Sequence, residues 1–254
     1  MLEVNELLEL AKSISTRAGL RLLNSLDQGK KEYVCSSEHP KEIKALADTV
    51  LEKDILQALI PKGLPILSEE SGFISGERES KYWFIVDPLD GTFNFVKGLG
   101  PSAISIALWQ DQKPIFGVIY SLTERQLFWG GVGIGAYCDG QKILVSDTLS
   151  KAEASICTGF PVRFESKSDL AIQKFLRMVR QYSKVRMLGS AAISLINIAK
   201  GAADVYSEQN IMIWDVAAGL AIVGGAGGSV HFNPGTIEHS LDVYASNRHL
   251  FEPN

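Results

Sequence analysis

The sequence predicts a fold of two halves, an α+β half with a meandering sheet followed by an α/β half. Three patterns predict it: the periodicity of an amphipathic helix near the N-terminus, a series of short strands between residues 102 and 146, and an alternation of strands and helices after residue 155. Such elements bury their apolar faces by stacking in layers. We place the boundary near residue 148, so that the halves span residues 1–148 and 149–254. We expect the functional site between them.

The first half begins with two predicted helices and two buried strands. Apolar residues recur at helical spacing over residues 4–22, and a second helix is predicted over residues 41–60, where a proline follows. The short apolar runs 64–67 and 82–86 are typical of buried strands. The polar, glycine-containing stretch 71–80 between them is predicted to be a loop.

Turn residues and glycines divide the rest of the chain. Between residues 102 and 146, Asp111-Gln112 and Asp139-Gly140 stand where hairpin turns belong. The predicted strands of the second half cover residues 155–158, 185–188 and 203–206, with short ones near Val230 and Val243. Its predicted helices cover residues 170–182, 190–200 and 216–223, the last ending at a glycine cluster, as helices often do.

Composition and charge exclude several classes of protein. Apolar residues make up 46% of the 254 residues, enough for a full core, and the net charge of −4 argues against a nucleic-acid-binding protein, which would show a basic surface. Cys35, Cys138 and Cys157 are odd in number and widely spaced, which is typical of free thiols in a reducing compartment. The chain shows no signal-peptide pattern and no apolar stretch of membrane-spanning length. We therefore expect a cytoplasmic protein without a membrane partner.

The most informative segment of the sequence follows the apolar run 82–86. A strand delivers Asp87 at its end, and Pro88 is predicted to fix a turn that lets the carboxylates of Asp87 and Asp90 converge. Two close carboxylates raise each other's pKa, and a hard divalent cation removes that penalty. Ligands that are all oxygen suit Mg²⁺, and the carbonyl of Leu89 would add one more.

Gly91 and Thr92 follow the two acids directly. If a helix begins there, its free N–H groups face the same spot and suit phosphate oxygens, while Gly91 allows close approach and Thr92 offers a hydroxyl to orient water. Asp, Pro and Gly are also common in surface turns. The apolar residues on both sides of this segment favour the functional interpretation over a solvated turn.

Two further acids fit the same site. Glu69 follows the apolar run 64–67 and therefore stands at a strand end, although it could also be a solvated loop residue. Asp215 is predicted to open a helix, where it would serve as an N-cap, a metal ligand or both.

Together these pieces resemble the signature of the inositol monophosphatase family. That signature is an acid pair after a strand, then D-P-[hydrophobic]-D-G-T-x-N, then W-D-x-[AS]-[AG]-G near the C-terminus. The chain carries all three in order, at Glu69-Glu70, Asp87–Asn94 and Trp214–Gly219, and the likeness extends over most of the chain. The resemblance implies a layered αβαβα sandwich, dependence on Mg²⁺, lithium sensitivity and a homodimer.

The resemblance also assigns roles to residues. Thr92 and Glu69 would activate the attacking water, assisted by Asp90, and two or three Mg²⁺ ions would be bound per site. Gly91 and Thr92 would contact phosphate, and Glu208 would bind substrate hydroxyls. The implied metal ligands are Glu69, Asp87, the Leu89 carbonyl, Asp90, Asp215 and Asp48. The implied substrate pocket also contains Gly189, Ser190, Ala191 and Asp215.

One segment departs from the family pattern. Many members carry D-x-V-T-x-x-D in the second helical region, and here residues 42–48 keep the final Asp48 but place Ala45 at the threonine position and Lys44 at an apolar one. Asp48 stays a candidate ligand for an additional metal ion, and Lys44 is interpreted as a solvated lysine.

The predicted substrate is a small phosphate monoester, most simply an inositol or sugar monophosphate, hydrolysed by metal-activated water. A 3'(2'),5'-bisphosphate nucleotide is the alternative, but the sequence shows no basic cluster for its second phosphate. Fructose 1,6-bisphosphate is another alternative on this fold. A non-catalytic regulatory protein on the same scaffold would be expected to lack a metal ligand. The acidic balance disfavours a nucleic acid partner.

Overall fold

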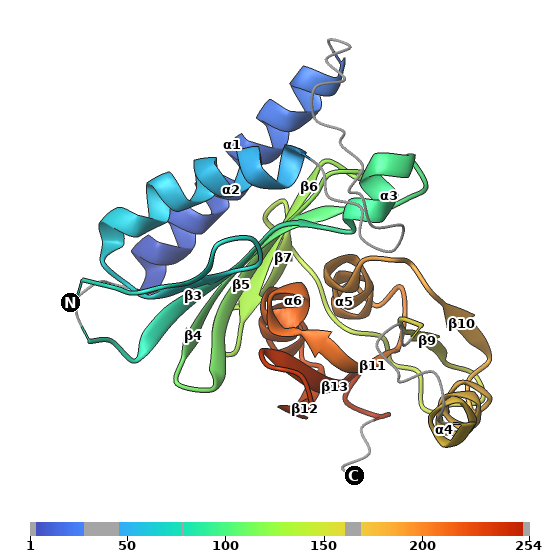
Figure 1. The fold of residues 1–254 in the computed structure, drawn as a ribbon. Coiled ribbons are helices and arrows are strands. Elements are labelled where there is room, and N and C mark those ends of the chain that lie inside the picture. The colour runs from blue at the N-terminus through green and yellow to red at the C-terminus, as the bar shows by residue number, and fades with distance from the viewer. Residues whose placement is uncertain (1–3, 28–45, 78, 161–168, 251–254) are drawn as a thin grey trace.

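The computed structural model describes residues 4–27, 46–77, 79–160 and 169–250, and it arranges helices and sheets in five layers (Figure 1). Helices α1 (Val4–Asp27) and α2 (Leu46–Leu59) cover one face of the first sheet. Helices α5 (Ala191–Ala199) and α6 (Ile213–Gly225) lie between the two sheets, and α4 (Asp169–Val179) lies beyond the second. The predicted αβαβα order is therefore confirmed.

The two N-terminal helices are confirmed in position. In α1, Leu7, Leu8, Ala11 and Ile14 are buried against the sheet, as the helical spacing of apolar residues predicts. The α2 helix is described from Leu46 and ends in a 3₁₀ turn, η2 (Ile60–Lys62), closed by Gly63. Residues 41–45 of the predicted second helix, with Lys44 and Ala45, lie outside the described residues.

The first sheet runs in the order β2-β1-β3-β4-β5-β6-β7-β8. Antiparallel pairing predominates, with β1 and β3 parallel. Asp111 and Asp139 occupy the predicted hairpin turns with positive φ angles. The strands are β1 (Ile66–Ser68), β2 (Gly72–Ile74), β3 (Tyr82–Asp90), β4 (Ala103–Gln110), β5 (Lys113–Ser121), β6 (Gln126–Gly131), β7 (Gly135–Cys138) and β8 (Gln141–Lys142).

Two predictions about this sheet were wrong. The predicted loop 71–80 contains β2, an edge strand whose three residues pair with β1 and are too few to show a period of two. The predicted turn at Pro88 is instead a β-bulge, because β3 continues to Asp90 while its register against β4 shifts between Asp87 and Asp90. Pro88 is tolerated there because a bulge interrupts the ladder of hydrogen bonds.

The second sheet runs in the order β10-β9-β11-β13-β12. The parallel pairs lie on one side, where β9 pairs with β10 and β11, and the antiparallel pairs lie on the other. Its predicted elements are confirmed with shifted ends. The strands are β9 (Ser155–Cys157), β10 (Lys184–Arg186), β11 (Val205–Met212), β12 (Ser229–Pro234) and β13 (Ser240–Ser246).

The core is divided between the two faces of the first sheet. One buried cluster joins α1 and α2 to the outward residues of β3–β5, and the other joins their inward residues to α5 and α6. The α6 helix packs against strands of both sheets, which explains why Val216–Val223 is apolar on every side. No helix among the described residues combines the length and apolar character that a membrane crossing requires.

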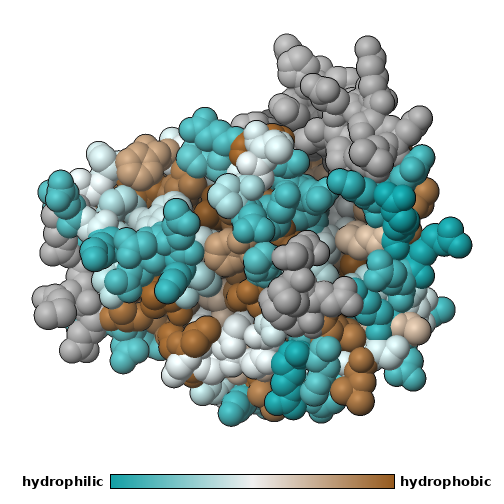
Figure 2. Space-filling model, turned by 90° about the horizontal axis from the view of Figure 1, so that it is seen from below, coloured by the Kyte–Doolittle hydropathy of each residue, from teal (hydrophilic) through white to brown (hydrophobic). Residues whose placement is uncertain are grey.

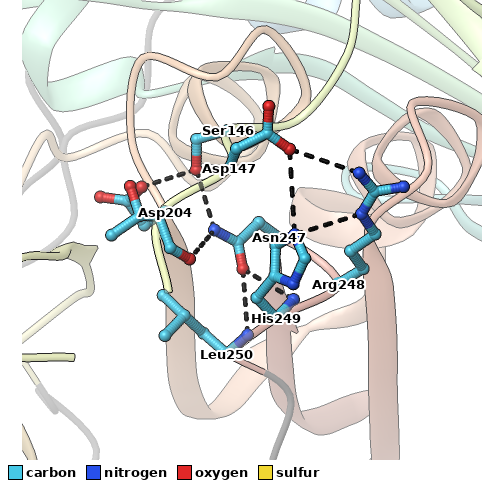
Figure 3. A network of polar contacts seen from close by, with 8 residues as sticks. Ser146, Asp147, Asp204, Asn247, Arg248, His249 and Leu250 are labelled. Carbon is cyan, nitrogen blue, oxygen red and sulfur yellow. Dashed lines mark hydrogen bonds and ion pairs between the residues drawn. The ribbon is translucent and has the colours of Figure 1, made fainter. Parts of the chain in front are cut away.

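A network of hydrogen bonds holds the segment that connects the first sheet to the second sheet (Figure 3). The Ser146 hydroxyl donates to Asp204 Oδ1 over 2.6 Å, and the Ser155 N–H donates to Asp204 Oδ2 over 2.7 Å. Asn247 Nδ2 donates to the Ser146 oxygen over 3.0 Å. Burial alone would raise the pKa of Asp204, but these hydrogen bonds lower it overall.

Candidate metal and phosphate site

Three carboxylates from distant parts of the chain meet where the two halves face each other. Glu69 directly follows β1, Asp87 lies in β3 at the bulge, and Asp215 lies in the first turn of α6. One oxygen of each lies within 4.8 Å of the others. This geometry could hold a cation, as the sequence predicts for these three residues.

Asp87 carries the clearest sign of a missing partner. Its side chain is 1% exposed, and its Oδ1 accepts a hydrogen bond from the Leu89 N–H over 2.9 Å. Its Oδ2 is buried and has no hydrogen-bond partner among the described residues. An unpaired buried carboxylate oxygen is costly unless it ligates a cation or the carboxyl group takes up a proton. The donor set therefore fits a hard metal ion such as Mg²⁺.

The crowding of acids shows in their pKa values. Glu69 is exposed as a whole residue, but the site shields its carboxyl group from water. This shielding, together with the charges of Asp48, Glu70 and Asp90, raises the pKa of Glu69 to about 7, although a hydrogen bond with Asp87 opposes the rise. Burial and the neighbouring carboxylates raise the pKa values of Asp87 and Asp215 as well. Bringing these acids together costs free energy at neutral pH, and a bound cation would offset that cost.

Asp90 stands beside this cluster and is held by α5. Its Oδ2 accepts hydrogen bonds from the Ser190 hydroxyl and from the Ala192 N–H, the latter over 2.9 Å. Burial raises the pKa of Asp90 to about 6, although these hydrogen bonds oppose the rise. The predicted ligand Asp90 therefore contributes charge to the site while it also joins the first half of the chain to the second.

Thr92 and Asp48 are also brought to the site. The Thr92 hydroxyl lies 2.9 Å from the Leu89 carbonyl oxygen and 3.2 Å from Asp48 Oδ1, and its one proton can be donated to either. Asp48 is buried in α2. The final acid of the divergent segment therefore lies beside Thr92, and its role as a metal ligand stays a prediction, while Ala45 and Lys44 lie outside the described residues.

Two glycines allow the backbone segments to approach each other. Helix α3 (Thr92–Lys97) begins after Gly91, as predicted, and Gly91 has a φ angle of 82°. A Cβ there would lie 2.8 Å from the Pro101 carbonyl oxygen. Gly189, with a φ angle of 71°, leaves room for Asn94, whose Nδ2 donates to the carbonyls of Pro101 and Leu188. Any side chain at Gly91 or Gly189 would separate the two halves of the site.

The predicted capping role of Asp215 is wrong. The N-cap of α6 is Met212, and Asp215 is the third residue of the helix. Asp215 therefore lies within the first turn and does not cap the helix. Ser190 is instead the N-cap of α5, and its hydroxyl oxygen accepts the Ile193 N–H over 3.1 Å.

A cavity of about 260 Å³ lies next to the acids and contains most of the predicted substrate residues, although Gly91 and Thr92 are not among its lining residues. On one side, Glu208 accepts a hydrogen bond from the buried Tyr206 hydroxyl over 2.9 Å, and a Cβ on Gly159 would collide with its carboxylate. The predicted substrate residues in its lining are Gly189, Ser190, Ala191, Glu208 and Asp215, and the predicted metal ligand Asp90 lines it as well. The lining residues that sequence reasoning missed are Thr158, Gly159, Phe160, Ser194 and Ile211, which belong to no motif.

The sequence model of the inositol monophosphatase family matches residues 3–251. The chain belongs to the inositol monophosphatase family. A "Fructose-1,6-bisphosphatase/inositol-1-monophosphatase" from Aquifex aeolicus is 31% identical over 99% of this chain and 95% of its own. A "Nus factor SuhB" from Xylella fastidiosa is 32% identical over 83% of this chain and 75% of its own.

Solved structures of related proteins have the same fold as this chain. The structure of the extragenic suppressor protein suhB from Bartonella henselae matches with a TM-score of 0.83 and 33% identity, covering 96% of this chain and 95% of that one. The fold and family membership of the chain are thus established independently of the geometry of its acidic cluster.

Proposed function

We propose that the protein is a Mg²⁺-dependent phosphatase that hydrolyses a small phosphate monoester, an inositol or sugar monophosphate. The observation that carries the proposal is the buried Asp87 Oδ2, which lacks a hydrogen-bond partner among the described residues and lies with two further carboxylates beside a cavity. A structural cluster would satisfy such an oxygen within the protein. Membership of the inositol monophosphatase family supports the same conclusion.

Six residues would hold two or three Mg²⁺ ions. Glu69, Asp87 and Asp215 form the common cluster, Asp90 and Asp48 stand beside it, and the Leu89 carbonyl faces the Thr92 hydroxyl. When bound, Mg²⁺ would neutralise phosphate charge and lower the pKa of a coordinated water.

The side chains themselves would position water and accept its proton. The Thr92 hydroxyl can donate to Leu89 or Asp48 while its oxygen accepts a hydrogen bond from water. Glu69, whose pKa is raised to about 7, is suited to take a proton near neutral pH. The backbone of Gly91 and Thr92 at the start of α3 would contact the phosphate oxygens.

The cavity beside the acids favours a small substrate rich in hydroxyl groups. Its volume of about 260 Å³ suits a molecule the size of a sugar or inositol, and the Glu208 carboxylate is oriented by Tyr206 to accept hydrogen bonds from hydroxyls. Another part of the lining consists of small residues, which take up little of the space in the cavity: Gly189, Ser190 and Ala191. Asp215 would contact both the metal and the substrate.

Two alternatives have specific support from the relatives. The Aquifex relative is also named as a fructose-1,6-bisphosphatase, which makes fructose 1,6-bisphosphate one alternative substrate. The other alternative is a non-catalytic regulatory protein on the same scaffold, and another relative is named a Nus factor. The complete set of Glu69, Asp87, Asp90 and Asp215 favours an enzyme, because a protein released from catalysis would not need an unpaired buried carboxylate.

A phosphate-release assay tests the proposal. The protein should release inorganic phosphate from inositol or sugar monophosphates with Mg²⁺, and chelation by EDTA or addition of lithium should abolish the release. Asp111, an exposed turn residue far from the site, offers the control Asp111→Asn, which should behave as the wild type. A homogeneous, folded protein that releases no phosphate from any of these esters with Mg²⁺ would refute the proposal.

We also propose a cytoplasmic homodimer, as the resemblance implies. Exposed apolar side chains such as Val132 and Leu149, at 74% and 71% exposure, offer surface that an assembly would cover. Sedimentation equilibrium gives the mass in solution, and a monomer at micromolar concentration would contradict this part of the proposal.

A further inference from the structure

An acidic side chain outside the cluster lies buried against the turn that carries Glu69. Charged side chains normally lie at the surface, and Figure 2 shows hydrophilic residues spread over the face of the molecule that is seen from below. Glu52, in α2, is only 7% exposed. A carboxylate is costly to bury unless hydrogen bonds satisfy its oxygens. The hydrogen-bond partners of Glu52 therefore indicate its role.

Glu52 receives three hydrogen bonds from the serines on either side of Glu69. The Ser68 hydroxyl donates to Glu52 Oε1 over 2.5 Å. Ser71 donates its N–H to Oε1 over 3.0 Å and its hydroxyl to Oε2 over 2.8 Å. Hydrogen bonds to an ionised acceptor are stronger than those between neutral groups. Both oxygens of the carboxylate therefore hold the short turn, residues 69–71, that joins β1 to β2.

This turn decides where the Glu69 carboxylate lies. The chain reverses between the paired strands β1 and β2 within residues 69–71, and Glu69 is the first residue of the turn. The Glu69 N–H donates to the carbonyl oxygen of Val86 over 3.1 Å, which places Glu69 next to Asp87. Glu52 holds the same turn through its serines. A shift of the turn would move the Glu69 carboxylate out of the acidic cluster.

The same face of α2 also reaches the Thr92 side of the site. Asp48 and Glu52 are four residues apart, so they are neighbours on the helix surface, and both are buried. Asp48 Oδ1 lies 3.2 Å from the Thr92 hydroxyl, whereas Glu52 contacts the turn of Glu69. Two acids of one helix face thus contact both groups that are proposed to act on the attacking water. Apolar residues at these two positions would cover the sheet but would make neither contact.

We propose that Glu52 is a positioning residue for Glu69. Its hydrogen bonds to Ser68 and Ser71 fix the turn and so hold the Glu69 carboxylate where it ligates Mg²⁺ and accepts a proton from water. Glu52 acts through Glu69 alone, and it is not among the residues that line the cavity beside the acids. The inference rests on the proposed function. Removal of a group that orients a metal ligand typically lowers metal affinity or activity by roughly 10- to 100-fold.

A double-mutant cycle tests the inference, with Glu52→Ala, Glu69→Gln and the variant that carries both changes. The substrate is inositol 1-phosphate, or glucose 1-phosphate if the wild type hydrolyses it faster. Glu52→Ala should lower kcat/KM roughly tenfold or more, and it should weaken Mg²⁺ binding, measured by isothermal titration calorimetry without substrate, by a similar factor. In the Glu69→Gln background the same change should alter either quantity less than about twofold, because the residue through which it acts is already lost.

Two further variants separate positioning from a general loss of stability. Glu52→Gln keeps an oxygen that can accept the Ser71 N–H, so both quantities should lie between those of Glu52→Ala and the wild type. Asp54→Ala is the matched control, because Asp54 lies on the same helix and accepts a hydrogen bond from Arg21 over 2.8 Å instead of from the turn. Its kcat/KM and Mg²⁺ affinity should equal those of the wild type.

If Glu52→Ala does not fold, Ser68→Ala/Ser71→Ala takes its place in the cycle, because it removes the two hydroxyl donors from the other side of the same contacts. The same results are expected. A tenfold loss in both backgrounds, or no loss in either, overturns this inference alone, since the first outcome shows a purely structural role and the second shows none. A folded wild type that releases phosphate from neither ester overturns the proposed function.

Discussion

Asp87 and Asp204 are both buried carboxylates, and the protein treats them in opposite ways. In the first half, Asp87 keeps one oxygen without a hydrogen-bond partner among the described residues and lies among other acids, and burial raises its pKa. In the second half, Asp204 receives hydrogen bonds from Ser146 and Ser155 on both oxygens, which lowers its pKa. The satisfied acid stabilises the fold, and the unsatisfied acid is available to a ligand.

The largest effect expected from this contrast concerns Asp87→Asn. The variant should lose roughly 10²- to 10³-fold in kcat, because one electrostatic contact of the transition state is removed. Without metal it should unfold at a higher temperature than the wild type, because a charge is removed from a crowded acidic site. Phosphate-release assays check the loss of activity, and thermal melts in EDTA check the gain in stability. Full activity in this variant would contradict the assignment of Asp87 as a functional acid.

Asp204→Ala should show the reverse pattern. Loss of the carboxylate leaves the Ser155 N–H and the Ser146 hydroxyl without their acceptor, and we expect the free energy of unfolding to fall by about 3 kcal/mol. Activity per folded molecule should persist. Urea denaturation gives the first quantity, and an unchanged unfolding midpoint would show that the network in Figure 3 contributes little.

The two kinds of acid also predict opposite dependences on pH. Folding raises the pKa of Glu69 from 4.5 to about 7 and that of Asp90 from 3.8 to about 6, so the folded, metal-free protein binds more protons than the unfolded chain in this range. Metal-free protein should therefore gain stability as the pH falls from 8 to 6. The contribution of Asp204 is present above its unfolded pKa of 3.8 and is lost only as the pH falls below that value.

Thermal melts at pH 8, 7 and 6 check this prediction, once in EDTA and once in Mg²⁺. The gain on acidification should vanish with Mg²⁺, because the ion holds the carboxylates in their charged form in the folded state. A metal-free protein that loses stability steadily from pH 8 to pH 6 would contradict the assignment of the raised pKa values.

The smallest effect concerns a hydroxyl that orients an acid without touching the cluster. Tyr206→Phe removes the hydrogen bond to Glu208 and should raise KM for a sugar or inositol monophosphate about three- to tenfold with little change in kcat. Tyr137→Phe, a change of the same size at a ring stacked on Trp129, is the matched control. Equal kinetics of Tyr206→Phe and the wild type would show that Glu208 needs no such support.

The sequence predicted those parts of the molecule that are local in the chain. The acids Asp87 and Asp90, the glycine and the start of α3 at Thr92 follow one another, so their convergence could be inferred from spacing. The distant acids Glu69 and Asp215 could be added because Glu69 directly follows a recognisable strand and Asp215 lies near the start of a recognisable helix. The alternation of apolar periods predicted alternating layers of helices and sheets, and the αβαβα order was implied by the resemblance to the inositol monophosphatase family.

What escaped prediction depends on contacts between segments or on very short elements. The β2 strand has three residues, and the bulge at Pro88 is visible only in the register of β3 against β4. The start of α6 was misplaced by three residues, because the helix begins at an apolar residue, Ile213, without a side-chain cap. Asp204 and Tyr206 act through partners that no motif associates with them.

The most direct test of the account is the shift in melting temperature caused by Mg²⁺ at pH 7.5, measured for the wild type, Asp87→Asn and Asp204→Asn. An ion that binds only the folded protein raises its melting temperature in proportion to its occupancy. We predict a clear rise for the wild type, an equal rise for Asp204→Asn from a lower starting temperature, and little or none for Asp87→Asn. An equal rise in all three proteins would contradict the claim that the unpaired oxygen of Asp87 is a metal ligand.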